Sequence, residues 1–238
     1  MSNSLTGVSF LQKGKGKDIV FLHGYLSNKE SFSAQIAYFS KFYRVTAIDF
    51  LGFGQSEELT SSFSVGDYAE WLFKVLQQLG VKNPHVIAHS FGCRVAVKLA
   101  SAKTDYFDKM VLTGPAGIIL NRGFVYQLKV GLYRCVKRFA PKWAERRFGS
   151  KEYRLLSPIM KESYKKIVNE DLRKCAGQVC NEVLILQGKT DTVTTKEEAM
   201  VYVKAFPKAR LRYIDGGHFA FAENATQFCL RVEEFLYG

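Results

Sequence analysis

The sequence of 238 residues contains no apolar run approaching the roughly 20 residues that a membrane-spanning helix needs. Its first residues, Met1 to Gly7, are polar and lack the hydrophobic middle of a signal peptide. Cysteine is scarce, with five residues, an odd number that follows no zinc-site or redox spacing. These absences argue against a membrane-spanning protein and a disulfide-stabilised secreted one. We expect a cytoplasmic protein with reduced cysteines, mostly packed in its core, and no metal site.

Acidic residues are also few, with 22 Asp and Glu against 34 Lys and Arg, which gives a formal net charge of +12. Between Asn121 and Gln178 the chain has fifteen basic and five acidic residues, so most of the excess lies in one quarter of the sequence. Such a segment can attract nucleic acid or acidic lipid, or it can be a solvated helical surface. Because no nucleic-acid-binding motif accompanies the charge, we favour the solvated surface and expect no nucleic-acid partner.

Short apolar runs rich in Val and Ile recur along the chain, each followed by turn residues. Near-continuous apolar character is typical of strands buried on both faces of a parallel sheet. Helical patterns lie between them, and the clearest spans 64–80, where Ser64 and Asp67 predict a cap and Gly80 an end. An early strand, Val8–Gln12, is predicted to pair antiparallel at the sheet edge. The six later runs are 18–24, 43–50, 85–90, 109–115, 182–188 and 209–217.

The alternation of strands and helices predicts an α/β fold with a mostly parallel central sheet flanked by helices. It stops over residues 117–177, which contain no strand-like run but several helical patterns, including 124–139. We therefore predict an α/β core formed by 1–116 and 178–238, with 117–177 as an inserted helical lid.

The lid pattern over 124–139 combines an apolar stripe with basic residues. A helix of this kind can cover a pocket, which we favour, or make transient contact with anionic lipid. Basic residues on the inner side of the predicted lid, 117–177, could select a substrate carboxylate or phosphate. Aromatic residues of the lid instead indicate an apolar pocket suited to a medium acyl chain or an aromatic group. They are Phe124, Tyr126, Tyr133, Trp143 and Tyr153.

A serine stands where one predicted strand gives way directly to a helix. In "VIAHSFG" (86–92), Ser90 follows the strand and the helical run "RVAVKLA" begins soon after. An abrupt strand-to-helix turn needs small residues two positions before and two after the serine, because bulk would collide across the bend. Ala88 and Gly92 meet that requirement. The pattern indicates an exposed nucleophile, although a serine at a helix start is by itself only a common cap.

A carboxylate and a histidine follow two later strands. Asp191 lies in the loop after 182–188, and His218 follows 209–217. A serine needs a base to take its proton, and that histidine needs a carboxylate to fix its orientation. Asp215 is a rival acid, but its position three residues before His218 favours a role at the end of the strand. The segment after 109–115 offers no carboxylate.

The chain resembles the α/β-hydrolase superfamily through five segments, each after the expected strand. These segments are "HGY" (23–25), "DFLGFGQS" (49–56), "AHSFG" (88–92), "GKTDTVT" (188–194) and "GGHF" (216–219). The elbow departs from the usual G-x-S-x-G by alanine at the first small position. Serine at the elbow also differs from the aspartate of the haloalkane dehalogenases and epoxide hydrolases.

The resemblance implies a catalytic triad of Ser90 as nucleophile, His218 as general base and acid, and Asp191 as the orienting carboxylate. The backbone N–H groups of Tyr25 and Phe91 would form the oxyanion hole. It implies no cofactor.

The function expected from these residues is hydrolysis of a carboxylic ester-like bond in a small-molecule substrate through an acyl-enzyme, as in carboxylesterases and other serine esterases. A thioesterase, an amidase or a carbon–carbon bond hydrolase would use the same triad. The alternative from a different functional class is a receptor or sensor of a small molecule, built on the same scaffold and with slow turnover. Oligomeric state is not predicted.

Overall fold

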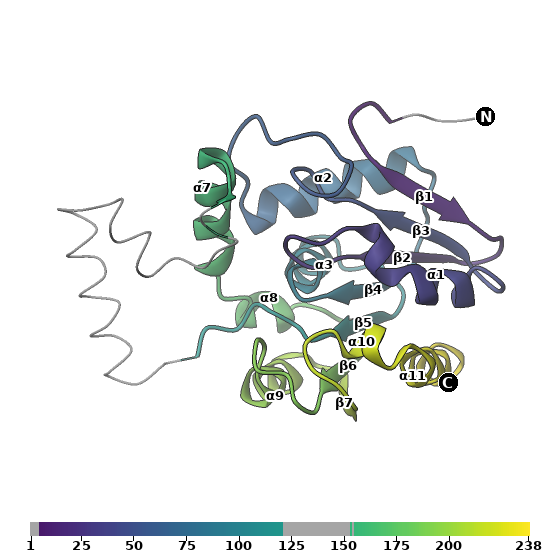
Figure 1. Ribbon diagram of the computed structural model, residues 1–238. Coiled ribbons are helices and arrows are strands. Elements are labelled where there is room, and N and C mark those ends of the chain that lie inside the picture. Colours follow the sequence, from purple (N-terminus) through teal and green to yellow (C-terminus); the bar gives the residue numbers. More distant parts are fainter. Residues whose placement is uncertain (1–4, 121–152, 154) are drawn as a thin grey trace.

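The computed structural model describes residues 5–120, 153 and 155–238 of the chain. Its centre is a seven-stranded sheet in the order β1-β3-β2-β4-β5-β6-β7 (Figure 1). Strand β1 pairs antiparallel with β3, and all other neighbours pair parallel. The strands are β1 (Phe10–Lys13), β2 (Asp18–Leu22), β3 (Arg44–Ile48), β4 (His85–His89), β5 (Met110–Thr113), β6 (Val183–Gly188) and β7 (Ala209–Ile214).

The predicted α/β fold with a mostly parallel sheet is confirmed. Each apolar run forms a strand, and the early run forms the antiparallel edge strand. Strands β2, β4, β5 and β6 are buried along their whole length, as continuous apolar sequence predicts. Strand β7 differs, because only Ile214 of its six residues is buried. Its place at the edge of the sheet explains why.

Helices cover both faces of the sheet. One face packs with α1 and α11, and the other with α2, α3, α8 and α9. The helices are η1 (Lys29–Phe32), α1 (Ser33–Phe39), α2 (Val65–Gln78), α3 (Phe91–Ala102), α7 (Pro158–Val168), α8 (Arg173–Ala176), α9 (Lys196–Ala205), α10 (Ala220–Glu223) and α11 (Ala225–Tyr237).

Helix α2 begins and ends where the sequence predicts. The side chain of Ser64 accepts a hydrogen bond from the backbone N–H of Asp67, and the Asp67 carboxylate accepts one from the N–H of Ser64. This reciprocal pair satisfies two N–H groups that the helix itself cannot. Gly80, just beyond the end, has φ +65°, which glycine adopts without strain.

The predicted lid stretch, 117–177, contains α7 and α8 within its described residues, and those residues form no strand. Figure 1 shows α7 beyond the carboxyl ends of the parallel strands. The predicted helix 124–139, with its proposed lipid contact, lies outside the described residues. The division into core and lid stays a prediction.

Within the described ranges, none of the helices has the length and apolar character to cross a membrane. The four described cysteines are all free. Cys93 and Cys229 are buried, Cys175 is half-buried and Cys180 is exposed, so core packing holds for two of them.

Candidate active site

Ser90 occupies the sharp turn between β4 and α3. Its φ of 48° and ψ of −106° are rare for a residue with a side chain, and such strain concentrates at functional sites. The turn brings the chain close to β2: a Cβ added to Gly92 would lie 2.3 Å from the carbonyl oxygen of Leu22. Only glycine fits there. The small residue required two positions after the serine thus has a direct structural cause.

Asp191 and His218 meet at the carboxyl ends of β6 and β7. The Nδ1 atom of His218 lies 2.9 Å from Oδ2 of Asp191, at hydrogen-bond distance. Because a carboxylate only accepts, Nδ1 donates this hydrogen bond, and Nε2 is the ring nitrogen left for another partner. The two residues lie 27 positions apart in the sequence, and the parallel pairing of β6 with β7 brings them together.

The Asp191 carboxylate is buried and held by several donors. Its Oδ1 accepts hydrogen bonds from the backbone N–H groups of Val193 and Thr194, and its Oδ2 accepts one from the Thr194 hydroxyl. Burial alone would raise the pKa of Asp191. The hydrogen bond and charge of His218, together with the bonds from Thr194, outweigh burial and lower this pKa to about 2. The group is ionised at neutral pH.

The rival acid lies elsewhere. Asp215 is exposed and forms an ion pair with Lys189, at 2.7 Å between Nζ and Oδ1. Its backbone carbonyl accepts a hydrogen bond from the side chain of Asn224. The structure therefore brings Asp191, and not Asp215, to the ring of His218.

Ser90 and His218 line one pocket with a volume of about 750 Å³. Tyr25 and Phe91, the predicted oxyanion-hole residues, line the same pocket. Phe91 is the first residue of α3, and the first N–H groups of a helix have no partner within it. Tyr25 follows β2 in a turn closed by a hydrogen bond from Ser27 N–H to the Gly24 carbonyl.

His23 braces the segment that carries Tyr25. Its Nδ1 lies 2.7 Å from the carbonyl oxygen of Gly24, and its Nε2 accepts the N–H of Phe50 at 3.0 Å. Burial lowers the pKa of His23, so the ring is neutral. It donates through one nitrogen and accepts through the other, as a loop brace would.

The "DFLGFGQS" segment is organised by its first residue. Asp49 is fully buried, and its carboxylate accepts hydrogen bonds from the backbone N–H and the ammonium group of Lys29 and from the N–H of Gln55. The hydroxyl of Ser56 donates to the Asp49 carbonyl. These bonds shape the loop.

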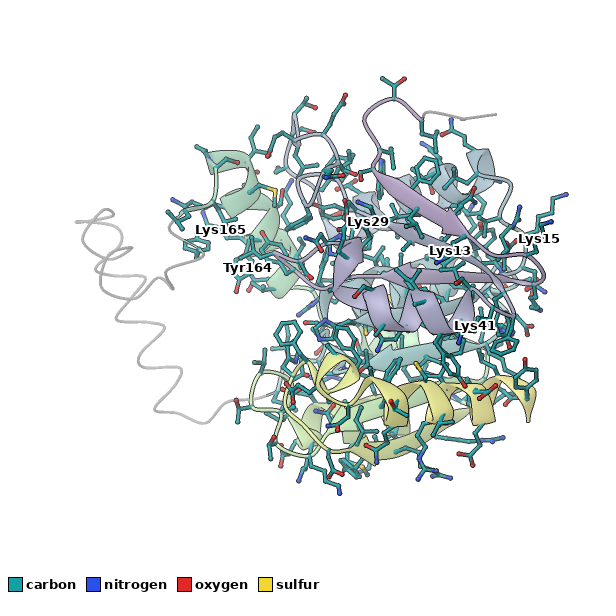
Figure 2. All side chains as sticks on the ribbon, turned by 45° about the vertical axis from the view of Figure 1, so that its right-hand side comes forward. Lys13, Lys15, Lys29, Lys41, Tyr164 and Lys165 are labelled. Carbon is teal, nitrogen blue, oxygen red and sulfur yellow. The ribbon has the colours of Figure 1, made fainter. Side chains whose placement is uncertain are left out.

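Aromatic rings form one wall of the pocket. The Tyr25 ring packs edge-on against Phe53, Phe91 and Tyr164, with ring centroids 4.9, 5.7 and 5.2 Å away. Tyr164 comes from α7, where Figure 2 labels it beside the exposed Lys165. Of the aromatics predicted to line the pocket, Tyr153 does so, and the other four lie outside the described residues.

Two residues of the site gave no clear signal in the sequence. Thr194 lies 3.3 Å from His218 Nδ1 as well as bonding Asp191. Arg94 is buried on α3 and lines the pocket. In the sequence Arg94 is a single charged residue inside the apolar run "CRVAV". Its importance became clear only from the position of α3. Among the described residues, no group of three or more His, Cys, Asp or Glu could hold a metal ion.

A family model described as the alpha/beta hydrolase fold matches residues 18–160, more than half of the chain. The chain belongs to this family. The match contains Ser90 and both predicted oxyanion-hole residues.

A hydrolase of (E)-2-((N-methylformamido)methylene)succinate from Acinetobacter baylyi is 30% identical over 115 residues, which are 48% of this chain and 43% of that protein. The alignment thus spans less than half of that relative.

Two solved structures have similar folds. A membrane phospholipase A, described as a bacterial virulence factor, has a TM-score of 0.79 and 19% identity, over 97% of this chain and 82% of that one. An esterase from Exiguobacterium antarcticum has a TM-score of 0.77 and 22% identity, over 97% and 96%. At these identities the likeness concerns the fold.

Proposed function

We propose that the chain is a serine hydrolase that cleaves a carboxylic ester-like bond of a small molecule through an acyl-enzyme intermediate. The observation that carries the proposal is the 2.9 Å contact between His218 Nδ1 and Asp191 Oδ2, in a pocket that the strained Ser90 also lines. Family membership supports it, because this fold positions such residues at the carboxyl ends of its strands.

In this mechanism Ser90 Oγ attacks the substrate carbonyl carbon while His218 Nε2 takes the hydroxyl proton. The resulting imidazolium is stabilised by the ionised Asp191. Collapse of the tetrahedral intermediate breaks the bond to the leaving group, which receives the proton from His218. Water, deprotonated by the same nitrogen, then hydrolyses the acyl-enzyme and frees Ser90.

The negative charge that develops on the carbonyl oxygen requires fixed donors. We assign the backbone N–H groups of Tyr25 and Phe91 to this role, since both residues line the pocket beside Ser90. Removing one such donor from a serine hydrolase costs about 3–4 kcal/mol of transition-state stabilisation. The hydrogen bonds of His23 would keep the Tyr25 segment in place during turnover.

The pocket favours an acyl group with apolar parts. Its wall of Tyr25, Phe91 and Tyr164 is aromatic, and its volume of about 750 Å³ is in the range of small-molecule sites. The same triad of Ser90, His218 and Asp191 would also serve to cleave thioesters, amides or carbon–carbon bonds. The hydrolase name of the Acinetobacter relative and the esterase name of the solved structure both agree with hydrolysis.

A panel of p-nitrophenyl esters of increasing acyl length tests the proposal on the purified protein. We expect steady-state release of p-nitrophenol that Ser90→Ala abolishes, with a length optimum that reports pocket depth. Ser101→Ala is the matched control, because Ser101 lies on the same helix, its hydroxyl donates to the Lys98 carbonyl, and it does not line the pocket. If a fluorophosphonate labels the protein but no steady-state turnover is seen, the proposed hydrolase activity is contradicted and a small-molecule sensor is favoured.

A further inference from the structure

Arg94 lies one helical turn after Ser90 on α3, and only 8% of its surface is exposed. Side chains on a helix lean toward its N-terminus, so Arg94 extends over the turn that begins at Ser90. Both residues line the same pocket. A charged group is thus buried close to the candidate nucleophile.

The hydrogen bonds of Arg94 use one end of its guanidinium. Nη1 donates to the backbone carbonyls of Ile167, at 2.8 Å, and Glu170, at 2.9 Å. Within the described part of the chain, no acceptor is bonded to Nε or Nη2. The Nε–Nη2 edge is the planar fork that matches the two oxygens of a carboxylate.

The two glutamates whose charges act on Arg94 are engaged with other groups. Glu170 forms an ion pair with Lys98, at 2.7 Å. Glu198 accepts the backbone N–H of Thr195 at the start of α9. Among the described residues, no carboxylate oxygen lies within 4.0 Å of the guanidinium.

Burial lowers the pKa of Arg94 from its usual value, and nearby tyrosines and glutamates act in the opposite direction. Arginine nevertheless keeps its proton in proteins. A buried cation without an ion pair is unfavourable unless an anion pairs with it. A purely structural link to α7 would need only a neutral donor at this position.

We propose that the Nε–Nη2 edge of Arg94 binds a carboxylate carried by the substrate, so that the site selects anionic over neutral esters. The inference rests on the proposed hydrolase function and specifies its substrate class. The aromatic wall would contact the apolar part of the substrate, and Arg94 its charged end.

Binding to the wild-type protein tests the carboxylate site without any turnover. The probes are 5-oxohexanoate, a ketone with one carboxylate, and the neutral 5-oxohexanamide of nearly equal shape. By isothermal calorimetry we expect the carboxylate to bind at least about 10-fold more tightly, because only it pairs with the buried cation. Equal or weaker binding of the carboxylate would overturn the proposal.

Turnover then assigns the preference to Arg94. The substrates are p-nitrophenyl hydrogen glutarate and its neutral glutaramate analogue, with the Ser90→Ala protein as the background. In Arg94→Met we expect kcat/KM for the anionic ester to fall about 30-fold or more, with less than about 3-fold change for the neutral ester. Arg94→Lys, which keeps the charge but loses the fork, should lie between.

The matched control is Lys103→Met, which removes a cation at the end of α3 that does not line the pocket. It should leave the ratio between the two esters unchanged. Equal losses on both esters in Arg94→Met would show a structural role and contradict the proposal. If neither ester is turned over but 5-oxohexanoate still binds preferentially, the hydrolase function fails and the carboxylate site stands.

Discussion

His89 Nε2 lies 2.9 Å from the backbone carbonyl oxygen of His218. The residue before Ser90 is thus bonded directly to the candidate base. Because a carbonyl only accepts, the proton of the His89 ring is on Nε2. The ring also packs against His218, with centroids 4.7 Å apart, and against Phe219. His89 is therefore placed to fix the position of the His218 loop.

Replacing His89 should impair turnover by displacing His218. We expect His89→Leu to lower kcat by up to about 100-fold with little change in KM, because the candidate base shifts while the aromatic wall of the pocket stays. His89→Gln can present an amide N–H near the position of Nε2 and should recover much of the loss. Thermal melts of both variants control for folding. Equal kcat values in the Leu and Gln variants would refute this positioning role.

Relief of backbone strain at Ser90 should stabilise the fold. The residue has φ 48°, a strain that costs on the order of 1–3 kcal/mol, and glycine tolerates that region at a smaller entropic cost. We expect Ser90→Gly to raise the free energy of unfolding in urea by about 1 kcal/mol. Ser90→Ala keeps the Cβ atom and should bring no such gain, while both variants lose turnover. A gain in the alanine variant would point to a cause other than strain.

A methyl group at Gly92 should be strongly destabilising. Its Cβ would lie 2.3 Å from the carbonyl oxygen of Leu22 and 2.8 Å from that of His23, and neither backbone group can move without shifting β2. We expect Gly92→Ala to lower the unfolding free energy by about 2–4 kcal/mol. Gly66→Ala, inside α2 and with ordinary contacts of 3.5 Å or more, should be neutral or stabilising by up to about 1 kcal/mol. Similar effects in both variants would contradict this packing argument.

Acid should unfold the protein in part through its buried histidines. Burial lowers the pKa of His85 to about 4 and that of His89 to about 3, below the value of about 6.5 in an unfolded chain. The unfolded chain therefore binds more protons as the pH falls below about 6.5, and stability declines toward pH 4. Each such histidine contributes a slope of about 1.4 kcal/mol per pH unit.

His85→Gln tests this titration away from the pocket. His85 stands at the start of β4 and its Nδ1 accepts the N–H of Lys109, a bond that glutamine can replace. Urea unfolding at several pH values between 4.5 and 7 should give a slope smaller by one proton in the variant. An unchanged slope would mean that His85 is protonated in the folded state.

The sheet could be predicted from the sequence because strands buried on both faces form continuous apolar runs. Residues such as Ile19, Val86 and Leu184 stand in runs without polar interruption, and each run became a strand. Ser90 and His218 were found because parallel strands end at one edge, so the residues after each strand converge. The cap of α2 could be predicted because it is a short-range pattern, with Ser64 and Asp67 three residues apart.

Other features depend on contacts that no local pattern encodes. The surroundings of Arg94 depend on the carbonyls of Ile167, in α7, and of Glu170, just after it, which lie more than 70 residues away in the chain. The bond from His89 to the His218 carbonyl spans 129 residues. Both required the tertiary fold.

The pairing of β5 with β6 has a consequence for synthesis on the ribosome. The serine turn emerges early, but the segments after β6 and β7 that carry Asp191 and His218 are translated only after residues 117–177, on the order of ten seconds later at ordinary elongation rates. A nascent chain that stops short of β7 would hold the candidate nucleophile, Ser90, without the candidate base, His218. Prematurely terminated products should therefore be catalytically silent.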